Sequence, residues 1–186
     1  MILGITGKIA SGKSEVLKIL KKQGFYCVDA DKIVHDLYKS GGVGANKIAT
    51  YFGEKFLNND GSVNRKKLRD EVFQNDDERK YLENLIHPEV FTVINDLIGR
   101  YKGKDIAIEA VYFDIDFLDD FVNKLIWVER DEDKIIQILL EGRGFDEILA
   151  KKLVDLIEKP NKIDFVFKND GSLQDLEKLV LSSLNL

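Results

Sequence analysis

Short apolar runs alternate with longer helical patterns along most of the chain. Runs rich in isoleucine, valine and phenylalanine recur at residues 2–6, 25–28, 106–109, 125–129 and 163–167. Such runs are typical of buried strands, and the segments between them show the spacing of amphipathic helices. Strands that alternate with helices favour a parallel sheet covered on both faces. The pattern therefore predicts a three-layer α/β fold with a five-stranded parallel sheet.

Two of the helical segments are longer than a simple connection between strands requires. Residues 32–102 contain several amphipathic patterns and no convincing strand, which predicts a helical insertion that receives a substrate. Residues 131–159 predict a helix, a turn and a helix, because Glu-Gly-Arg-Gly-Phe at 141–145 interrupts the pattern. We expect this second segment to be a mobile lid. Residues 1–31, 103–130 and 160–186 then form the core of a single domain.

Composition and charge narrow the class of protein. The 186 residues, 44% hydrophobic and 33% charged, suffice for one domain with one core, and the formal charge of −5 does not indicate a nucleic-acid or membrane surface. Cys27 is the only cysteine, which excludes an intrachain disulfide. The first apolar run ends after about five residues, too few for a signal peptide or membrane span. We expect a cytoplasmic protein without nucleic-acid or membrane partners, and we favour a monomer.

A phosphate-binding loop follows the first predicted strand. Residues 7–14 read Gly, four residues, then Gly-Lys-Ser, and a helical run over 15–22 comes next. In such a loop, successive backbone N–H groups converge on phosphate oxygens, and the start of the helix adds its positive dipole. Lys13 would reach the β- and γ-phosphates, and the Ser14 hydroxyl would ligate Mg²⁺. The alternative is a glycine-rich turn that happens to contain lysine and serine.

Two residues of this loop carry separate expectations. Lys8 either places an additional cation near the triphosphate or points into water. Ala10 stands where such loops often have glycine. Because a positive φ would cost alanine about 1–2 kcal/mol, we expect Ala10 to adopt an ordinary right-handed conformation.

Two aspartates end the second predicted strand. The alternation of strand side chains places Asp29 and Asp31 on the same side of the chain, at the sheet edge where α/β proteins bind ligands. A carboxylate there can accept the proton of a hydroxyl that attacks phosphorus. Alternatively, one aspartate caps the helix that we expect to begin near Lys32. We assign the cap to Asp29 and catalysis to Asp31.

Further motifs follow in a definite order. They are Asp-Ala-Asp-Lys-Ile-Val-His at 29–35, Asn-Arg-Lys-Lys-Leu-Arg at 64–69 with Val72-Phe73, Leu82-Glu83, Ile86-His87-Pro88, and Asn-Asp-Gly-Ser at 169–172. Together with the loop, this order and spacing resemble the dephospho-coenzyme A kinase family over essentially the whole chain. The resemblance implies transfer of the ATP γ-phosphate to the ribose 3′-hydroxyl of dephospho-CoA, with Mg²⁺. It also implies a P-loop kinase fold with a helical CoA-binding insertion and a helical lid.

The resemblance implies roles for individual residues. Asp31 is similar to the catalytic base, and Lys13 also to a catalytic phosphate-binding residue. Lys67, Arg69 and His87 match the region that receives the acceptor; a solvated helix face, and for His87 a packed histidine ending a helix, are the alternatives. Asn169 resembles a loop that passes the adenine, or is part of a plain turn. The candidate nucleotide-binding residues are Gly7, Lys8, Ile9, Ala10, Ser11, Gly12, Lys13, Ser14, Glu15 and Asn169.

The chain departs from the family pattern at two places. After the third strand, Ile-Glu-Ala-Val-Tyr-Phe-Asp at 108–114 replaces a Pro-Leu-Leu-Phe-Glu-like stretch. Glu109 and Asp114 are the candidates for the missing acid, and we choose Glu109 as an outer magnesium or acceptor contact. In the lid, family members usually carry arginines one turn apart, whereas residues 138–140 are Ile-Leu-Leu, with Arg143 beyond them. We predict that Arg143 closes over the phosphates, with Arg130 as the alternative; each could equally be a surface arginine.

Two other functions remain open from the sequence. One is a P-loop kinase of similar architecture that phosphorylates a nucleoside or nucleotide. The other is a non-catalytic nucleotide-binding protein whose altered lid does not support phosphate transfer.

Overall fold

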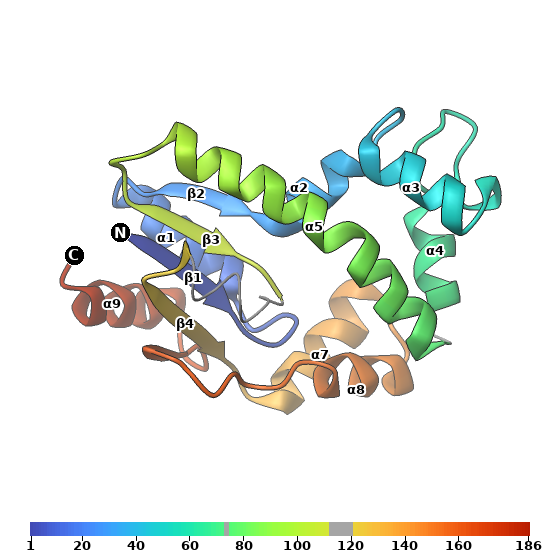
Figure 1. Cartoon of the computed structure of the whole chain (residues 1–186). Coiled ribbons are helices and arrows are strands. Elements are labelled where there is room, and N and C mark those ends of the chain that lie inside the picture. The colour runs from blue at the N-terminus through green and yellow to red at the C-terminus, as the bar shows by residue number, and fades with distance from the viewer. Residues whose placement is uncertain (73–74, 112–120) are drawn as a thin grey trace. The chain divides into compact units, whose positions relative to one another are not determined.

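The computed structural model of the chain describes residues 1–72, 75–111 and 121–186, and only the backbone of Arg143 (Figure 1). The chain divides into two compact units. One comprises Met1–Val28 and Tyr101–Leu186, and the other comprises Asp29–Arg100.

The first unit contains the sheet. Its strands are β1 (Ile2–Thr6), β2 (Tyr26–Asp29), β3 (Ile106–Glu109), β4 (Lys124–Glu129) and β5 (Phe165–Lys168), in the order β2-β3-β1-β4-β5. β1 pairs in parallel with β3 and β4, and β4 pairs in parallel with β5. The predicted five-stranded parallel sheet is confirmed, and each predicted strand lies within two residues of the observed one.

Two helices cover one face of this sheet. They are α1 (Lys13–Lys22) and α9 (Leu173–Leu184), which contact one another. Apolar residues of α1 recur at helical spacing and are buried, whereas Lys18, Lys21 and Lys22 are exposed. The shared core consists mainly of Leu3, Ile5, Val16, Leu20, Ala107, Ile126, Val128, Phe167, Leu176 and Val180. This core anchors the ends of the loop that joins β1 to α1.

The segment between β4 and β5 forms a pair of helices, as the sequence predicts. They are α7 (Glu132–Arg143) and α8 (Glu147–Asp155), and the Asp131 and Asp146 side chains cap their first turns. Gly144 ends α7 in the left-handed conformation, with φ 65°. The two helices pack through buried Ile135, Leu139, Ala150 and Val154.

The second unit is helical throughout its named elements. It contains α2 (Ala30–Leu37), α3 (Val43–Tyr51), the 3₁₀ turn η1 (Glu54–Phe56), α4 (Arg65–Val72) and α5 (Asp76–Arg100). α5 packs against α2, α3 and α4. Within the described part of this unit, the extended pairing is limited to an isolated bridge between Leu57 and Val63.

The alternative that His87 ends a helix is wrong, because α5 continues through Pro88 to Arg100. Proline has no N–H to donate within the helix, so the turn before it lacks one backbone hydrogen bond. The carbonyl that loses this donor is that of Asn84. One residue further along, Lys47 Nζ of α3 donates to the Leu85 carbonyl at 3.3 Å, and Lys47 pairs with Glu89 at 2.6 Å. Lys47 therefore ties α3 to the turn of α5 that contains the proline.

None of the helices in the described residues combines the length and the apolar character that crossing a membrane requires.

Candidate active site

The loop between β1 and α1 depends on glycine at two positions. Gly7 has φ 149° and Gly12 has φ 102°. A Cβ at Gly7 would lie 2.3 Å from the Val128 carbonyl oxygen, and one at Gly12 would lie 2.0 Å from Asn169 Nδ2. Gly12 is the N-cap of α1 and contributes no side-chain cap. The first N–H groups of the helix are thus suited to an anion.

Lys13 places its ammonium group inside the curve of the loop. The side chain is buried, and Nζ donates to the carbonyl oxygens of Gly7 and Lys8, each at 3.0 Å. Glu15 follows in the first turn of α1 and pairs with Lys18 at 2.7 Å. The loop therefore holds one buried cation at its centre, next to the helix N-terminus.

The expectation for Ala10 is wrong, because its φ is 56°, in the left-handed region. That conformation costs alanine about 1–2 kcal/mol. Two sets of contacts offset the cost. The Ala10 carbonyl accepts a hydrogen bond from Arg130 Nη1 at 3.2 Å, and Ile9 and Ala10 pack against the cluster between α7 and α8. The expectation considered only the local steric cost, and these tertiary contacts lie outside it.

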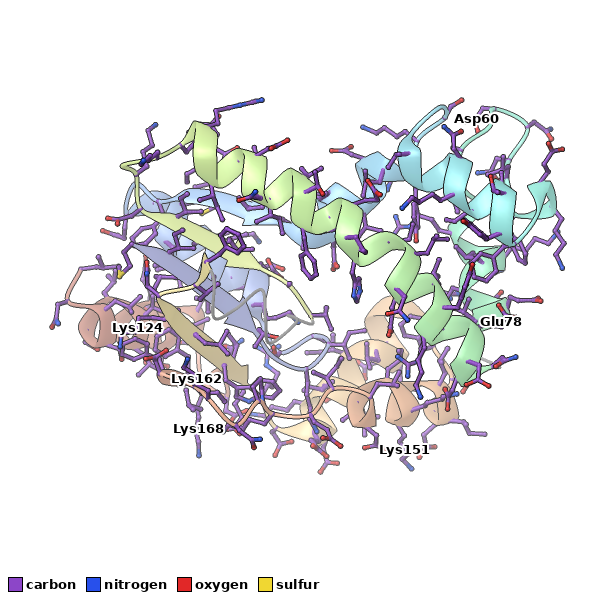
Figure 2. All side chains as sticks on the ribbon, in the orientation of Figure 1. Asp60, Glu78, Lys124, Lys151, Lys162 and Lys168 are labelled. Atoms are coloured by element: carbon purple, nitrogen blue, oxygen red, sulfur yellow. The ribbon has the colours of Figure 1, made fainter. Side chains whose placement is uncertain are left out.

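Asn169 lies directly after Lys168, the last residue of β5, which Figure 2 labels. It is buried, and its Nδ2 donates to the Ser11 carbonyl at 2.8 Å. The backbone carbonyl of Asn169 accepts from Arg130 Nε at 2.9 Å. The sequence singled out Asn169 and Arg130 but not these contacts with the loop. The sequence signal of Arg130 was its position directly after a strand, and that of Asn169 was the Asn-Asp-Gly-Ser motif at 169–172.

Lys8 connects the loop to α7. Its ammonium pairs with the Glu132 carboxylate in the first turn of α7, so Lys8 does not simply point into water. Glu132 was not among the predicted site residues, because nothing local distinguishes it from other acids at a helix start.

Ser14 and Glu109 meet beside the loop. The Ser14 hydroxyl donates to Glu109 Oε1 at 2.8 Å. Glu109 is buried at the end of β3, and its Cα is paired with that of Ile5 on β1. Mg²⁺ at nucleotide sites is usually held by one or two protein oxygens together with phosphates and waters. A hydroxyl and a carboxylate in contact match that donor set.

A cavity of about 590 Å³ opens next to Lys8. Its walls come from the end of β4, the start of α7, the chain after α8 and the end of β5. The lining residues are Lys8, Trp127, Val128, Glu129, Arg130, Asp131, Glu132, Asp155, Ile157, Glu158, Lys159, Lys168 and Asp170. Six of these residues are acidic, four are basic, and Trp127, Val128 and Ile157 are apolar, so the cavity suits a polar ligand.

In the helical unit, the prediction that Asp29 caps a helix is confirmed. Its Oδ1 accepts from the Lys32 N–H at 3.2 Å, and α2 begins at Ala30. The argument that strand alternation extends to Asp31 is wrong, because β2 ends at Asp29 and Asp31 lies in the first turn of α2. Asp31 is exposed. Because the helix begins directly after Asp29, Asp31 is already helical and the alternation of strand side chains does not apply to it.

Two of the motifs meet in this unit. Arg65 Nη1 lies 3.0 Å from His35 Nδ1, which must accept because arginine only donates. Nearby, burial raises the pKa of Tyr38 to about 12, although the Arg65 charge acts in the opposite direction. Asn64 accepts from the Lys67 N–H at 3.0 Å and so caps α4. The sequence did not predict the contact between His35 and Arg65.

The predicted acceptor residues lie on α4 and α5. The Lys67 ammonium is 5.8 Å from the centre of the Phe56 ring, and Lys67 lines a hollow of about 380 Å³ with Asn64, Lys66, Asp70 and Glu71. Arg69 Nη2 lies 3.1 Å from Asp70 Oδ1. The His87 ring is half-buried and 6.0 Å from the Phe91 ring. Phe73 and Asp114 lie outside the described residues, as does the side chain of Arg143.

Together, a glycine-lysine-serine loop between the first strand and the first helix of a five-stranded parallel sheet, and a helical pair over that loop, define a P-loop kinase. The family model of dephospho-CoA kinase matches residues 1–175, and the chain belongs to this family. The resemblance that the sequence motifs indicated is therefore confirmed.

Individual relatives support the assignment. A dephospho-CoA kinase from Fusobacterium nucleatum is 35% identical over 184 residues, covering 97% of this chain and 95% of the relative. One from Listeria monocytogenes is 31% identical over 189 residues, covering 97% and 94%. Among solved structures, a dephospho-CoA kinase from Campylobacter jejuni is 25% identical with a TM-score of 0.63 over 99% of this chain and 95% of that one. A shikimate kinase from Bacteroides thetaiotaomicron shares the fold, with 15% identity and a TM-score of 0.56 over 100% and 99% of the two chains.

Proposed function

We propose that this chain transfers the γ-phosphate of ATP to the ribose 3′-hydroxyl of dephospho-CoA. The observation that carries the proposal is the phosphate loop with Lys13 at its centre, in a chain whose residues 1–175 match the dephospho-CoA kinase family. The relatives from Fusobacterium and Listeria bear the same name as the family.

The loop supplies the electrostatic part of catalysis. Lys13 donates to two loop carbonyls, and the same ammonium can instead donate to β- and γ-phosphate oxygens. The N-terminus of α1 adds N–H donors and a positive dipole. Because the backbone N–H groups are fixed by the helix, they stabilise developing charge without further reorganisation.

Ser14 and Glu109 are the residues that would hold Mg²⁺. The Ser14 hydroxyl is the expected direct ligand, and the Glu109 carboxylate, 2.8 Å from it, would orient that hydroxyl or a metal-bound water. Mg²⁺ held by these residues would supply positive charge that offsets the charge of the transferring phosphate.

Asp31 is the proposed general base. It is exposed and lies two residues after β2, whose carboxyl end belongs to the sheet edge at which α/β proteins bind ligands. Asp29 is occupied by its cap, which supports the assignment of catalysis to Asp31. In the catalytic complex, the Asp31 carboxylate would take the proton from the attacking 3′-hydroxyl.

The acceptor and the lid complete the proposal. Lys67, Arg69 and His87 would contact dephospho-CoA, whose diphosphate requires cations. The cavity beside Lys8 would take the nucleoside of ATP, next to Asn169 and Asp170. Arg143, at the end of α7, would close over the phosphates. We further propose a monomeric cytoplasmic enzyme.

One assay tests the function. Purified protein with Mg-ATP is offered dephospho-CoA, adenosine and AMP in parallel, and phosphorylated products are separated by chromatography. Formation of coenzyme A from dephospho-CoA alone is the expected result. Phosphorylation of adenosine or AMP would instead identify a nucleoside or nucleotide kinase. Tight ATP binding without any product would identify a non-catalytic nucleotide-binding protein.

A further inference from the structure

Arg130 and Asn169 hold two consecutive carbonyl groups of the phosphate loop. Arg130 Nη1 donates to the Ala10 carbonyl at 3.2 Å, and Asn169 Nδ2 donates to the Ser11 carbonyl at 2.8 Å. The two residues are also linked, because Arg130 Nε donates to the backbone carbonyl of Asn169 at 2.9 Å. Asn169 is in turn tied to β4 through its N–H, which donates to the Glu129 carbonyl at 2.8 Å. The loop is therefore braced from the ends of β4 and β5.

This bracing determines how the loop peptides face. In a trans peptide the N–H points opposite to the C=O, and none of the described peptides is cis. Anchoring the Ser11 carbonyl to Asn169 thus turns the Gly12 N–H away from Asn169. Gly12 is the N-cap of α1, directly before the helical N–H groups that suit an anion. The brace therefore sets the direction of a donor at the start of the anion site.

The brace acts where the loop is strained. Ala10 has φ 56°, which alanine avoids in the absence of compensating contacts. Its carbonyl is held by Arg130, and its side chain packs with Ile9 against the α7–α8 cluster. Without Arg130, only the packing against the α7–α8 cluster would offset the cost of this conformation.

We infer that Arg130 is a positioning residue, which acts through the loop backbone and keeps the loop in the conformation that binds the phosphate chain. Asn169 shares this role. The inference rests on the proposed function, because it assumes that this loop binds a triphosphate. It deepens that proposal by assigning Arg130 a role other than that of a lid arginine. Two donor groups of Arg130, Nε and Nη1, are already engaged by backbone carbonyls.

A population argument gives the expected effect. If only part of the protein has the competent loop, the apparent affinity falls by that fraction. Arg130→Met removes the brace at Ala10, so KM for ATP should rise about fivefold to tenfold, whereas kcat should change by less than about twofold. Ala10→Gly removes the cost of the left-handed conformation. In the Ala10→Gly background, the same Arg130→Met change should therefore raise KM by less than about twofold.

The test compares four proteins: wild type, Arg130→Met, Ala10→Gly and the double variant. Each is assayed for KM and kcat with ATP, and for inhibition by inorganic tripolyphosphate, which has neither base nor ribose. A loop effect lowers the affinity for tripolyphosphate and ATP by the same factor, and Ala10→Gly reduces both losses. Equal losses in the two Ala10 backgrounds, or a loss confined to ATP, would show direct contact between Arg130 and the nucleotide and would overturn the inference. An unchanged KM in Arg130→Met would do so as well.

Controls separate this result from misfolding and from failure of the proposed function. Arg100→Met changes an exposed arginine at the end of α5 and should leave KM unchanged. Hydrogen exchange of residues 8–12 in the nucleotide-free proteins should accelerate in Arg130→Met while exchange in α1 and α9 stays slow. Uniformly faster exchange would indicate a general loss of stability instead, and would count against the inference. If wild type does not bind ATP, the proposed function fails, whereas the exchange result still reports on the brace.

Discussion

The Ser14 hydroxyl donates a hydrogen bond to Glu109 Oε1 at 2.8 Å, although 95 positions separate the two residues in the chain. β3 lies beside β1 in the sheet, and this neighbour relationship brings the end of β3 next to the loop that follows β1. A buried carboxylate therefore lies in contact with the hydroxyl that is expected to ligate Mg²⁺.

Replacing Glu109 with glutamine should lower activity and raise the Mg²⁺ concentration that activity requires. Glutamine keeps an oxygen that can accept from Ser14 but removes the negative charge. Because residues that orient a metal ligand typically contribute 10–100-fold, we expect kcat/KM to fall by about that factor and the Mg²⁺ requirement to increase. A titration of activity against Mg²⁺ measures both effects. An unchanged titration curve in a variant of wild-type thermal stability would remove Glu109 from the metal site.

Asp31→Asn should separate binding from turnover. Loss of a positioned general base typically costs 10²–10⁴-fold, so kcat should fall by about that factor while ATP binding stays near normal. The matched control is Asp29→Asn, because asparagine also caps helices well and should preserve the bond to the Lys32 N–H. Steady-state kinetics and ATP titration of both variants provide the measurement. A large loss of kcat in the Asp29 variant alone would reverse the two assignments.

The N-terminus of α9 makes stability depend on pH. Ser172 and Asp175 form a capping box, in which hydrogen bonds from the Ser172 hydroxyl and then from its backbone N–H lower the pKa of Asp175. A lowered carboxyl pKa stabilises the folded chain above the pKa of the unfolded state, about 3.9. That contribution is lost as the pH falls from there through the lower folded value. The free energy of unfolding, measured with urea at pH 6 and at pH 3, should differ less in Asp175→Asn than in wild type.

The control for this prediction is Asp60→Asn. Asp60 lies in an exposed loop of the helical unit, labelled in Figure 2, and Ser62 likewise lowers its pKa through the side chain and the backbone. Asp60→Asn should likewise reduce the difference in the free energy of unfolding between pH 6 and pH 3. It should do so without affecting α9. If Asp175→Asn preserves the whole pH difference, the capping box does not contribute to acid stability.

Pro88→Ala should stabilise the helical unit. Alanine restores an N–H in the interior of α5, and proline there is about 3 kcal/mol less favourable than alanine in a regular helix. We therefore expect the free energy of unfolding to rise by about 1–3 kcal/mol. Denaturant unfolding measures the change. Asn95→Ala, at an exposed site on the same helix, should change it by less than about 0.7 kcal/mol. A destabilised Pro88 variant would mean that the proline-adapted geometry is the more favourable one.

Sequence reasoning was most successful where the signal is local. The buried strands, the Gly-Lys-Ser loop, the Asp29 cap and the helix–turn–helix around Gly144 were all predicted, because apolar periodicity, caps and glycine conformations act over a few residues. It failed at Pro88, where α5 continues through the proline while packed against α2, α3 and α4, and at Ala10, where tertiary contacts outweigh the local preference.

By itself, the sequence determined the class of fold, the family and the identity of the phosphate loop, since each is specified by residues close together or by motifs in a fixed order. Only the tertiary structure decided which residues contact that loop. The Ser14–Glu109 contact, the pairing of Lys8 with Glu132 and the brace from Arg130 and Asn169 all join segments about 95 to 158 positions apart. Such contacts arise from the order of strands in the sheet, and that order depends on how all the elements bury their apolar faces together.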